Sequence, residues 1–420
     1  MNPNMKEKMI KATKDLVKIR DSDLMPSQKL DAIRVFLIPR FSYLMQNSSP
    51  RVEDLAEYDR AISFAVKKIC KIHLHGGALP YIYSPISHGG LGIPCVTDEY
   101  MLYSIVTVYK SLINKDPRMQ SFGIERLKRT VEMWSGLEAS PEVCGDYLSH
   151  RTPAEIDPFY TPKYTYMGNL SRYRNAVKNL GKLGINFDVQ FSDTYDISLK
   201  VITPDQKTMI FDQSFKGKIF ASLRNIITEN YFNQLITKYP NQVRMMHDIS
   251  QSKLSNQFVR DGRYINSSSF RFVHRARLNL LPIGGTPMEP LLKTDYGNFQ
   301  PDLLKIDEQK KSVVIFDLII SQEAKNHLCK AFEIKREKYT NLAISYSNKG
   351  YTAKVMPIVL GQLGKWSIES EKAIEELGIS SYRQTSIIRK MIITTLNSSK
   401  DIYYTHLLLP NIHKLKVVEK

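Results

Sequence analysis

Residues 301–320 read PDLLKIDEQKKSVVIFDLII, and their pattern indicates the secondary structure of the C-terminal part of the chain. The run Lys311–Ile320 is largely apolar, which predicts a buried strand. The segment Leu303–Ile306 predicts a second strand, and the polar residues Asp307–Lys310 between the two predict a turn. From about Pro287 onward the pattern is therefore that of an α/β region.

Two carboxylates accompany these predicted strands. Asp302 lies at the start of the first strand, and Asp317 lies inside the apolar second strand. An aspartate in so apolar a strand needs a cation or a hydrogen-bond partner, because burying it alone costs too much free energy. Strands joined by a turn can place both aspartates side by side. Their mutual repulsion then favours a divalent cation with oxygen ligands, such as Mg²⁺.

The helix predicted next, over residues 322–347, carries two lysines that share a face. Lys335 and Lys338 are three residues apart. One could orient a water activated by the metal for attack on a phosphodiester, and the other could hold a phosphate. The alternative is structural, with Asp317 in a salt bridge and the lysines on a solvated helix face. The α/β pattern continues with a strand over Ala353–Leu360 and helices over Ile368–Leu377 and Tyr382–Leu396.

The first 113 residues are predicted to be mostly helical. Pro39 should kink or restart the second of the predicted helices, because proline lacks the backbone N–H that a helix interior needs. The glycine-rich stretch Gly76–Pro94 is predicted to be a loop, and no Gly-Lys-Ser/Thr follows to make it a phosphate loop. The apolar periodicity predicts helices over Met5–Arg20, Gln28–Gln46, Val52–Ile72 and Thr97–Ile113.

Residues 114–286 contain the strongest local signal for nucleic-acid binding. Alternating residues over Asn186–Phe211 predict a small β unit, and Phe215–Tyr239 predicts a helix. Basic side chains are then dense over Ser250–Leu281, which is typical of a surface that binds phosphates. The residues of this segment predicted to contact nucleic acid are Lys253, Arg271, His274, Arg275 and Arg277.

The composition also indicates a polyanionic partner. The 420 residues include 59 Lys and Arg against 42 Asp and Glu, a net charge of +17, and the pI is near 9.4. Nucleic acid is the first expectation and a membrane surface the second. No run of about eighteen apolar residues predicts a transmembrane helix. The cysteines are too dispersed for a disulfide framework or a zinc finger: Cys70, Cys95, Cys144 and Cys329.

In order and approximate spacing, Pro301-Asp302, Asp317 and Lys335–Tyr339 resemble the endonuclease of site-specific non-LTR retrotransposons, closest to the R-two-like clade. The resemblance implies mainly α-helical N-terminal and linker regions followed by a C-terminal α/β restriction-like nuclease domain of the PD-(D/E)xK type. It implies Mg²⁺ or Mn²⁺ held by the two aspartates, a DNA target and the element's RNA as partners, and the nucleus as location. The catalytic residues would be Asp302, Asp317, Lys335 and Lys338, and Tyr339 would contact nucleic acid.

The resemblance extends upstream and downstream of this pattern. It implies a reverse-transcriptase-thumb-like domain over residues 1–113, a basic nucleic-acid-binding linker over 114–286 and the endonuclease over 287–420. Leu30–Leu44 resembles the start of the family's thumb, and Ser87–Pro94 resembles its glycine-rich motif. Phe270–Pro282 resembles the linker motif, and Val359–Trp366 resembles the strand-to-loop segment of the nuclease.

The sequence departs from the family at three points. The polymerase sequence aromatic-Ala-Asp-Asp does not occur, so this chain alone should not polymerise DNA. The segment Gly284–Gln300 contains no cysteine or histidine, so the family's zinc knuckle is missing, and Gln300 replaces a residue that is commonly basic. We expect a C-terminal piece of an element that binds nucleic acid and nicks DNA for target-primed reverse transcription. The alternatives are a non-catalytic DNA- or RNA-binding remnant and a decayed reading frame.

Overall fold

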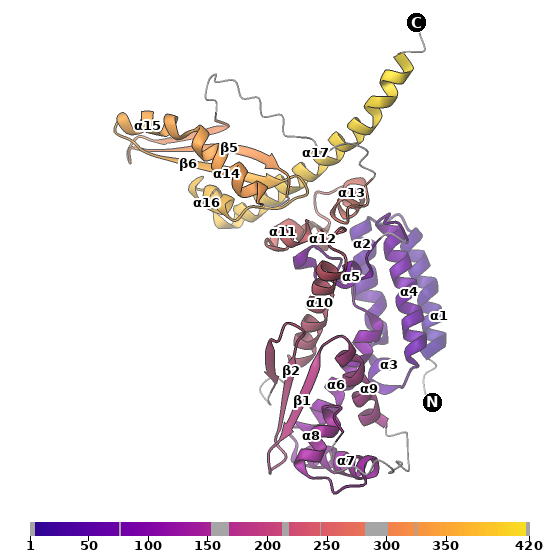
Figure 1. Ribbon diagram of the computed structural model, residues 1–420. Helices are drawn as coiled ribbons and strands as arrows, with labels where there is room; N and C mark the ends of the chain where they lie inside the picture. Colours follow the sequence, from indigo (N-terminus) through magenta and orange to yellow (C-terminus); the bar gives the residue numbers. More distant parts are fainter. Residues whose placement is uncertain are drawn as a thin grey trace. The chain divides into compact units, whose positions relative to one another are not determined.

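The computed structural model describes residues 5–74, 77–152, 168–211, 218–243, 245–281, 301–323 and 326–416. These residues are mostly helical and contain two three-stranded sheets, so the predicted mixture of helix and strand is confirmed (Figure 1). The cysteine-free stretch Gly284–Gln300 and the loop that precedes it lie outside the described residues. In the described part of the chain, no helix combines the length and the apolarity needed to cross a bilayer.

Contacts divide the chain into two compact units that interleave along the sequence. Unit 1 contains Met1–Ile19, Ala32–Ser63 and Gly92–Asn233, and unit 2 contains Arg20–Asp31, Phe64–Leu91 and Gln234–Lys420. Helices α4 (Val52–Ile69) and α10 (Ile219–Lys238) supply residues to both units. The domain boundaries expected at residues 113 and 286 stay predictions.

Unit 1 contains helices and a small antiparallel sheet. The strands β1 (Asn186–Phe191), β2 (Ile197–Ile202) and β3 (Thr208–Phe211) lie in that order, where the alternating sequence predicts a β unit. Val189 pairs with Leu199, and both are buried in the core because alternate residues of a strand share a face. Unit 1 also contains most of α1 (Met5–Asp21) and parts of α4 and α10. Its other α-helices are α3 (Ser42–Asn47), α6 (Val96–Leu112), α7 (Pro117–Ser135), α8 (Pro141–Leu148) and α9 (Gly168–Lys182).

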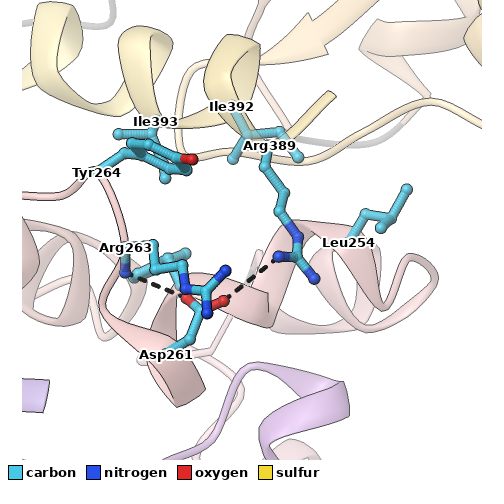
Figure 2. A pocket seen from close by; sticks show the side chains of 8 residues that line it. Leu254, Asp261, Arg263, Tyr264, Arg389, Ile392 and Ile393 are labelled. Atoms are coloured by element: carbon cyan, nitrogen blue, oxygen red, sulfur yellow. Dashed lines mark hydrogen bonds and ion pairs between the residues drawn. The ribbon is translucent and has the colours of Figure 1, made fainter. Parts of the chain in front are cut away.

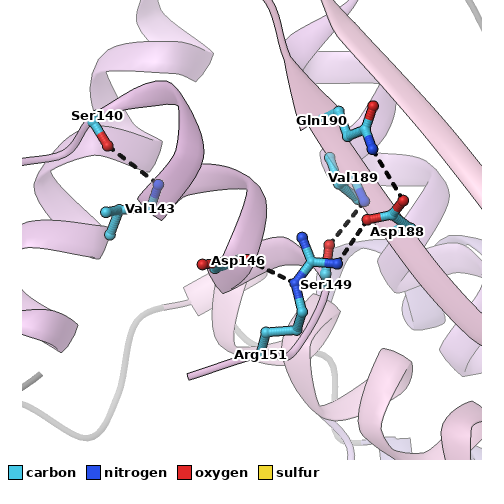
Figure 3. A network of polar contacts seen from close by, with 8 residues as sticks. All are labelled: Ser140, Val143, Asp146, Ser149, Arg151, Asp188, Val189 and Gln190. Carbon is cyan, nitrogen blue, oxygen red and sulfur yellow. Dashed lines mark hydrogen bonds and ion pairs between the residues drawn. The ribbon is translucent and has the colours of Figure 1, made fainter. Parts of the chain in front are cut away.

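Polar contacts join the end of α8 to β1 (Figure 3). The Arg151 guanidinium lies 2.7 Å from a carboxylate oxygen of Asp146 and 2.7 Å from one of Asp188. The backbone N–H of Val189 donates to the Ser149 hydroxyl at 2.8 Å. Because one guanidinium engages both carboxylates, this network fixes the position of α8 on the sheet.

Unit 2 contains the predicted C-terminal sheet. Strand β4 (Leu303–Asp307) pairs antiparallel with β5 (Ser312–Ser321), and β5 pairs in parallel with β6 (Thr352–Gly361). Parallel strands need a crossover connection, which here includes α14 (His327–Lys338) and α15 (Thr340–Asn348). Both helices cover the same face of β5, with α15 on Val313 and Ile315 and α14 on Ile319.

Short helices and one long helix complete unit 2. The long helix α17 (Ser381–Lys416) extends well beyond the predicted end at Leu396. The others are α2 (Pro26–Asp31), α5 (Leu79–Tyr83), α11 (Met246–Ser250), α12 (Gln257–Asp261), α13 (Ser267–Arg277) and α16 (Glu369–Glu376).

Two of the predicted helices are interrupted in the structure, one at Tyr339 and the other around Pro39. The helix predicted over residues 322–347 begins at His327 and breaks at Tyr339, whose backbone has φ −100° and ψ 8° and whose side chain is buried. The helix predicted over 28–46 is replaced around Pro39 by a π-helical turn, Ala32–Leu37, and a 3₁₀ turn, Ile38–Phe41. The restart at Pro39 follows the prediction.

Candidate functional site

The hairpin of β4 and β5 brings Asp302 and Asp317 to the same end of the sheet. Leu303 pairs with Phe316, so Asp302, one residue before β4, continues the register opposite Asp317. The Asp302 carboxylate accepts a hydrogen bond from the backbone N–H of Leu318 at 2.6 Å. Asp302 is exposed, whereas Asp317 is only 4% exposed.

Asp317 has a partner for each carboxylate oxygen. The Nζ of Lys335 lies 2.5 Å from Oδ2 and forms an ion pair, and the Tyr339 hydroxyl donates to Oδ1 at 2.8 Å. Lys335 and Tyr339 are four residues apart, so the end of α14 presents both groups to β5. These contacts offset the cost of burying the carboxylate in an apolar strand.

The pKa of the Tyr339 hydroxyl is shifted by its surroundings. Burial raises the pKa of Tyr339 above its usual value, and the hydrogen bond to Asp317 and the charges of Asp317 and Asp302 raise it further. The phenol therefore stays protonated near neutral pH and acts as a donor.

Lys338 differs from Lys335 in its surroundings. It is exposed, and its Nζ lies 4.9 Å from the centroid of the Tyr339 ring, which is a cation–π contact. The structure thus gathers Asp302, Asp317, Lys335 and Tyr339 at one place and leaves the Lys338 ammonium at the surface beside them.

The two carboxylates form a donor set that suits a hard cation. Proteins commonly hold Mg²⁺ by one or two carboxylates, and waters and substrate phosphate oxygens complete its coordination. Among the residues that the structure describes, no group of three or more His, Cys, Asp or Glu side chains could enclose a metal ion. A cation at Asp302 and Asp317 would therefore take its remaining ligands from water and from a bound substrate.

Of the residues predicted to bind nucleic acid, His274 is fully buried in α13. Its Nδ1 lies 2.6 Å from the Tyr81 hydroxyl, and its ring contacts those of Phe258 and Phe270. Burial, with the nearby charge of Arg277, lowers the pKa of His274 to about 3. The imidazole is therefore neutral at physiological pH and adds no charge to a phosphate-binding surface.

Arg277 is also buried, with 1% of its surface exposed. Its guanidinium donates to Oδ1 of Asn256 at 2.9 Å and to the backbone oxygens of Ser255 and Leu363 at 3.1 and 3.3 Å. Its Cζ lies 5.0 Å from the centroid of the Phe258 ring. These contacts give Arg277 a structural part in this arrangement: it ties α13 to the segment that follows β6.

The other predicted basic contacts reach the surface to different extents. Lys253 is exposed, and Arg271 and Arg275 are half-buried. Arg271 donates through Nε to the backbone oxygen of Ile69 at 3.1 Å, and Arg275 donates to the Tyr404 hydroxyl at 2.9 Å. These three residues, unlike His274 and Arg277, present part of their side chains to solvent.

Sequence reasoning missed a buried carboxylate in the same unit, Glu323. It follows β5 and accepts hydrogen bonds from the backbone N–H groups of Leu363 and Lys365. Burial raises the pKa of Glu323 to about 7. The one feature of the sequence that marks Glu323 is its place two residues after an apolar strand. Acidic residues are common at such places, so this feature does not predict that Glu323 is buried.

A small pocket lies between α12 and α17 (Figure 2). Its volume is about 10 Å³, which is barely enough for one water. Asp261 accepts from the backbone N–H of Arg263 at 3.2 Å and pairs with Arg389 at 3.4 Å. We interpret this pocket as a packing contact.

Comparisons with known proteins give one partial family match and several partial relatives. A family model described as the T26G10.4 domain matches residues 102–280. The uncharacterized protein T26G10.4 of Caenorhabditis elegans is 27% identical over 284 residues, which cover 64% of this chain and 78% of that protein.

Retrovirus-related Pol polyproteins from the type-1 retrotransposable element R2 of Popillia japonica give shorter matches. One is 35% identical over 79 residues, which cover 19% of this chain and 18% of that protein. Another is 27% identical over 125 residues, which cover 29% of this chain and 26% of that protein. The matches therefore span about a quarter or less of these polyproteins. They support a retrotransposon-related origin for the chain.

Proposed function

We propose that this chain is a retroelement-derived protein that binds nucleic acid and nicks target DNA with a metal-dependent, restriction-like endonuclease. The resemblance to non-LTR retrotransposons implies that such a nick would prime reverse transcription. The polymerase aspartates needed for that step do not occur in this sequence. The proposal is supported by the partial similarity to R2 polyproteins and by the geometry around Asp317.

One observation carries the catalytic part of the proposal. Asp302, Asp317 and Lys335 are spread over more than thirty residues of sequence, yet the β4–β5 hairpin and α14 bring them together. An ion pair alone would explain Asp317 and Lys335, but it gives no reason for a second carboxylate at the same end of the hairpin. A site for a divalent cation explains all three. The β4-β5-β6 sheet with its crossover helix is compatible with a restriction-like fold.

Each residue has a distinct part in the proposed site. Asp302 and Asp317 would hold Mg²⁺ or Mn²⁺, which supplies Lewis-acid polarisation of a phosphodiester and a more acidic bound water. The Lys335 ammonium, beside Asp317, orients a water and stabilises negative charge on the phosphate. The Tyr339 hydroxyl fixes the orientation of the Asp317 carboxylate. The exposed Lys338 ammonium holds a flanking phosphate.

The proposed partners are the DNA target and the element's RNA, with the nucleus as the place of action. The net charge of +17 supports a polyanionic partner of either kind. Of the predicted basic contacts, Lys253, Arg271 and Arg275 have side chains at least partly open to solvent. We therefore assign nucleic-acid contact to these three and a structural part to His274 and Arg277.

The test is Mg²⁺-dependent nicking of supercoiled plasmid by the purified chain. We expect conversion to the open circle in Mg²⁺ or Mn²⁺, none in EDTA, and none with Asp317→Ala. A matched control is Asp307→Asn, which removes a half-buried carboxylate at the far end of β4. Nicking that survives Asp317→Ala would indicate a contaminating nuclease or another site.

The second candidate is a non-catalytic nucleic-acid-binding remnant. It is favoured by the small acidic set, since the described residues hold no cluster of three metal-ligating side chains. Binding of plasmid without any nicking, over several salt and metal concentrations, would establish this alternative.

A further inference from the structure

A basic groove in unit 2 lies outside the proposed catalytic site. Its volume is about 730 Å³, within the range of ligand-binding sites. It is formed by segments some two hundred residues apart in sequence: the end of α4 with the residues after it, and α13 with the residues after it. The lining residues are Lys67, Lys68, Lys71, Ile72, His73, Leu74, Arg275 and Leu280.

The positive charge of this groove is not neutralised within the protein. Among the described residues, no carboxylate lies within ion-pair distance of Lys68, Lys71 or Arg275, whereas pairs occur elsewhere, such as Lys365 with Asp248. Lys68 and Lys71 are exposed. The buried Nε–H of Arg275 has no acceptor in the described part of the chain. Like charges gathered without a counter-charge favour an external anion.

Part of this arrangement has a structural explanation. Lysines in the last turn of α4 interact favourably with the carboxyl end of the helix dipole. Lys67 has a further structural contact, since its Nζ donates to the backbone oxygen of Leu74 at 2.8 Å. Neither effect explains why a second element brings Arg275 to the same groove.

The groove also has apolar lining. Ile72 is buried, and Leu74 and Leu280 are half-buried. A strand of nucleic acid matches both features, because its phosphates pair with cations and its sugars and bases contact apolar surface. A free inorganic phosphate would use only the charges.

We propose that this groove binds the phosphodiester backbone of a nucleic-acid strand, with Lys68, Lys71 and Arg275 as its phosphate contacts. The inference rests on the proposed nucleic-acid-binding function and adds a second contact surface away from Asp302 and Asp317. It requires no base recognition, so binding there is independent of sequence.

The test measures binding of labelled single-stranded DNA, duplex DNA and RNA of one sequence by fluorescence anisotropy, from 0.05 to 0.5 M salt, roughly the range over which counterion release is read. The variant is Lys68→Gln with Lys71→Gln, which spares the structural Lys67. The matched control is Lys110→Gln with Lys115→Gln, which removes two exposed lysines that do not line the groove. Circular dichroism verifies the fold of both.

We expect the groove variant to lower the salt slope by about 1.4 for a single strand and about 1.8 for a duplex, since each lost phosphate contact removes about 0.7 or 0.9. If the wild type and the groove variant bind equally at 1 M salt, these slope changes correspond to about 15- to 30-fold weaker binding by the variant near 0.15 M. A probe whose slope falls by the amount given for its strand type occupies the groove, and a probe whose slope is unchanged does not. The control should have the wild-type slope.

Two outcomes would overturn the inference, and they are distinguishable. If the wild-type chain binds nucleic acid and the groove variant has the same slope as the control on all three probes, the groove assignment fails alone. If the wild-type chain binds none of the probes, the proposed function fails with it. Arg275→Gln is a second variant, with an expected slope change of about one from the other wall of the groove.

Discussion

The ion pair between Asp317 and Lys335 can be measured by a double-mutant cycle. The perturbations are Asp317→Asn, Lys335→Gln and the double variant. The two charges are 2.5 Å apart, and their side chains are 5% and 20% exposed. Breaking a buried pair by removing one partner typically costs 3–5 kcal/mol. Because Lys335 keeps some contact with water, we expect about 3 kcal/mol for Asp317→Asn and a coupling energy of about 1–3 kcal/mol.

The chain offers a local reporter for this measurement. It has two tryptophans, and Trp366, which is 1% exposed, belongs to the same unit as Asp317. In a Trp134→Phe background, the fluorescence of Trp366 during guanidinium unfolding follows that unit. The control cycle uses Asp307→Asn and Lys310→Gln, whose side chains are 34% and 81% exposed and whose charges lie 3.9 Å apart; this pair should couple by less than about 0.5 kcal/mol. A coupling between Asp317 and Lys335 as small as the control would refute the buried pair.

Three further predictions use the same unfolding assay. Tyr339→Phe should cost about 1–3 kcal/mol, because Oδ1 of Asp317 loses its donor; an unchanged midpoint would contradict that hydrogen bond. Arg277→Ala should lower the free energy of unfolding by at least about 3 kcal/mol, whereas Lys253→Ala, at an exposed residue, should change it by less than about 0.5 kcal/mol. Equal effects of the two substitutions would contradict the buried position of Arg277. Because the pKa of His274 is about 3 when folded and about 6.5 when unfolded, the unfolded state binds the proton first, and the free energy of unfolding should fall as pH decreases from 6.5. His274→Gln should reduce the pH dependence of the free energy of unfolding between about pH 7 and 5, and His247→Gln, at an exposed histidine, should not. A larger reduction by His247→Gln than by His274→Gln would show that another group causes the pH dependence.

The sequence predicted the features that depend on short-range order. The strands around Asp302 and Asp317 are joined by a turn of a few residues, so apolar patterning alone indicates the hairpin. Lys335 was predicted to lie on the next helix, and its contact with Asp317 follows once that helix covers β5. The small antiparallel sheet of unit 1 is also built from neighbours in sequence.

The features that the sequence did not predict depend on long-range contacts. Arg277 resembles its exposed neighbours in sequence, but its partners Asn256 and Leu363 are 21 and 86 residues away. The break at Tyr339 likewise depends on Asp317, 22 residues earlier, whose carboxylate accepts from the buried hydroxyl. A local pattern cannot distinguish a buried arginine or tyrosine from one at a binding surface.

The central claim is that the two aspartates form a metal-dependent nuclease site. The most direct measurement is the initial rate of Mg²⁺-dependent plasmid nicking by the wild-type chain and by Asp302→Asn, Asp317→Asn and Asp307→Asn. We expect nicking by the wild type and by Asp307→Asn, and none by the other two. Equal rates in all four proteins, or no nicking by a folded wild-type chain that binds the plasmid, would contradict it.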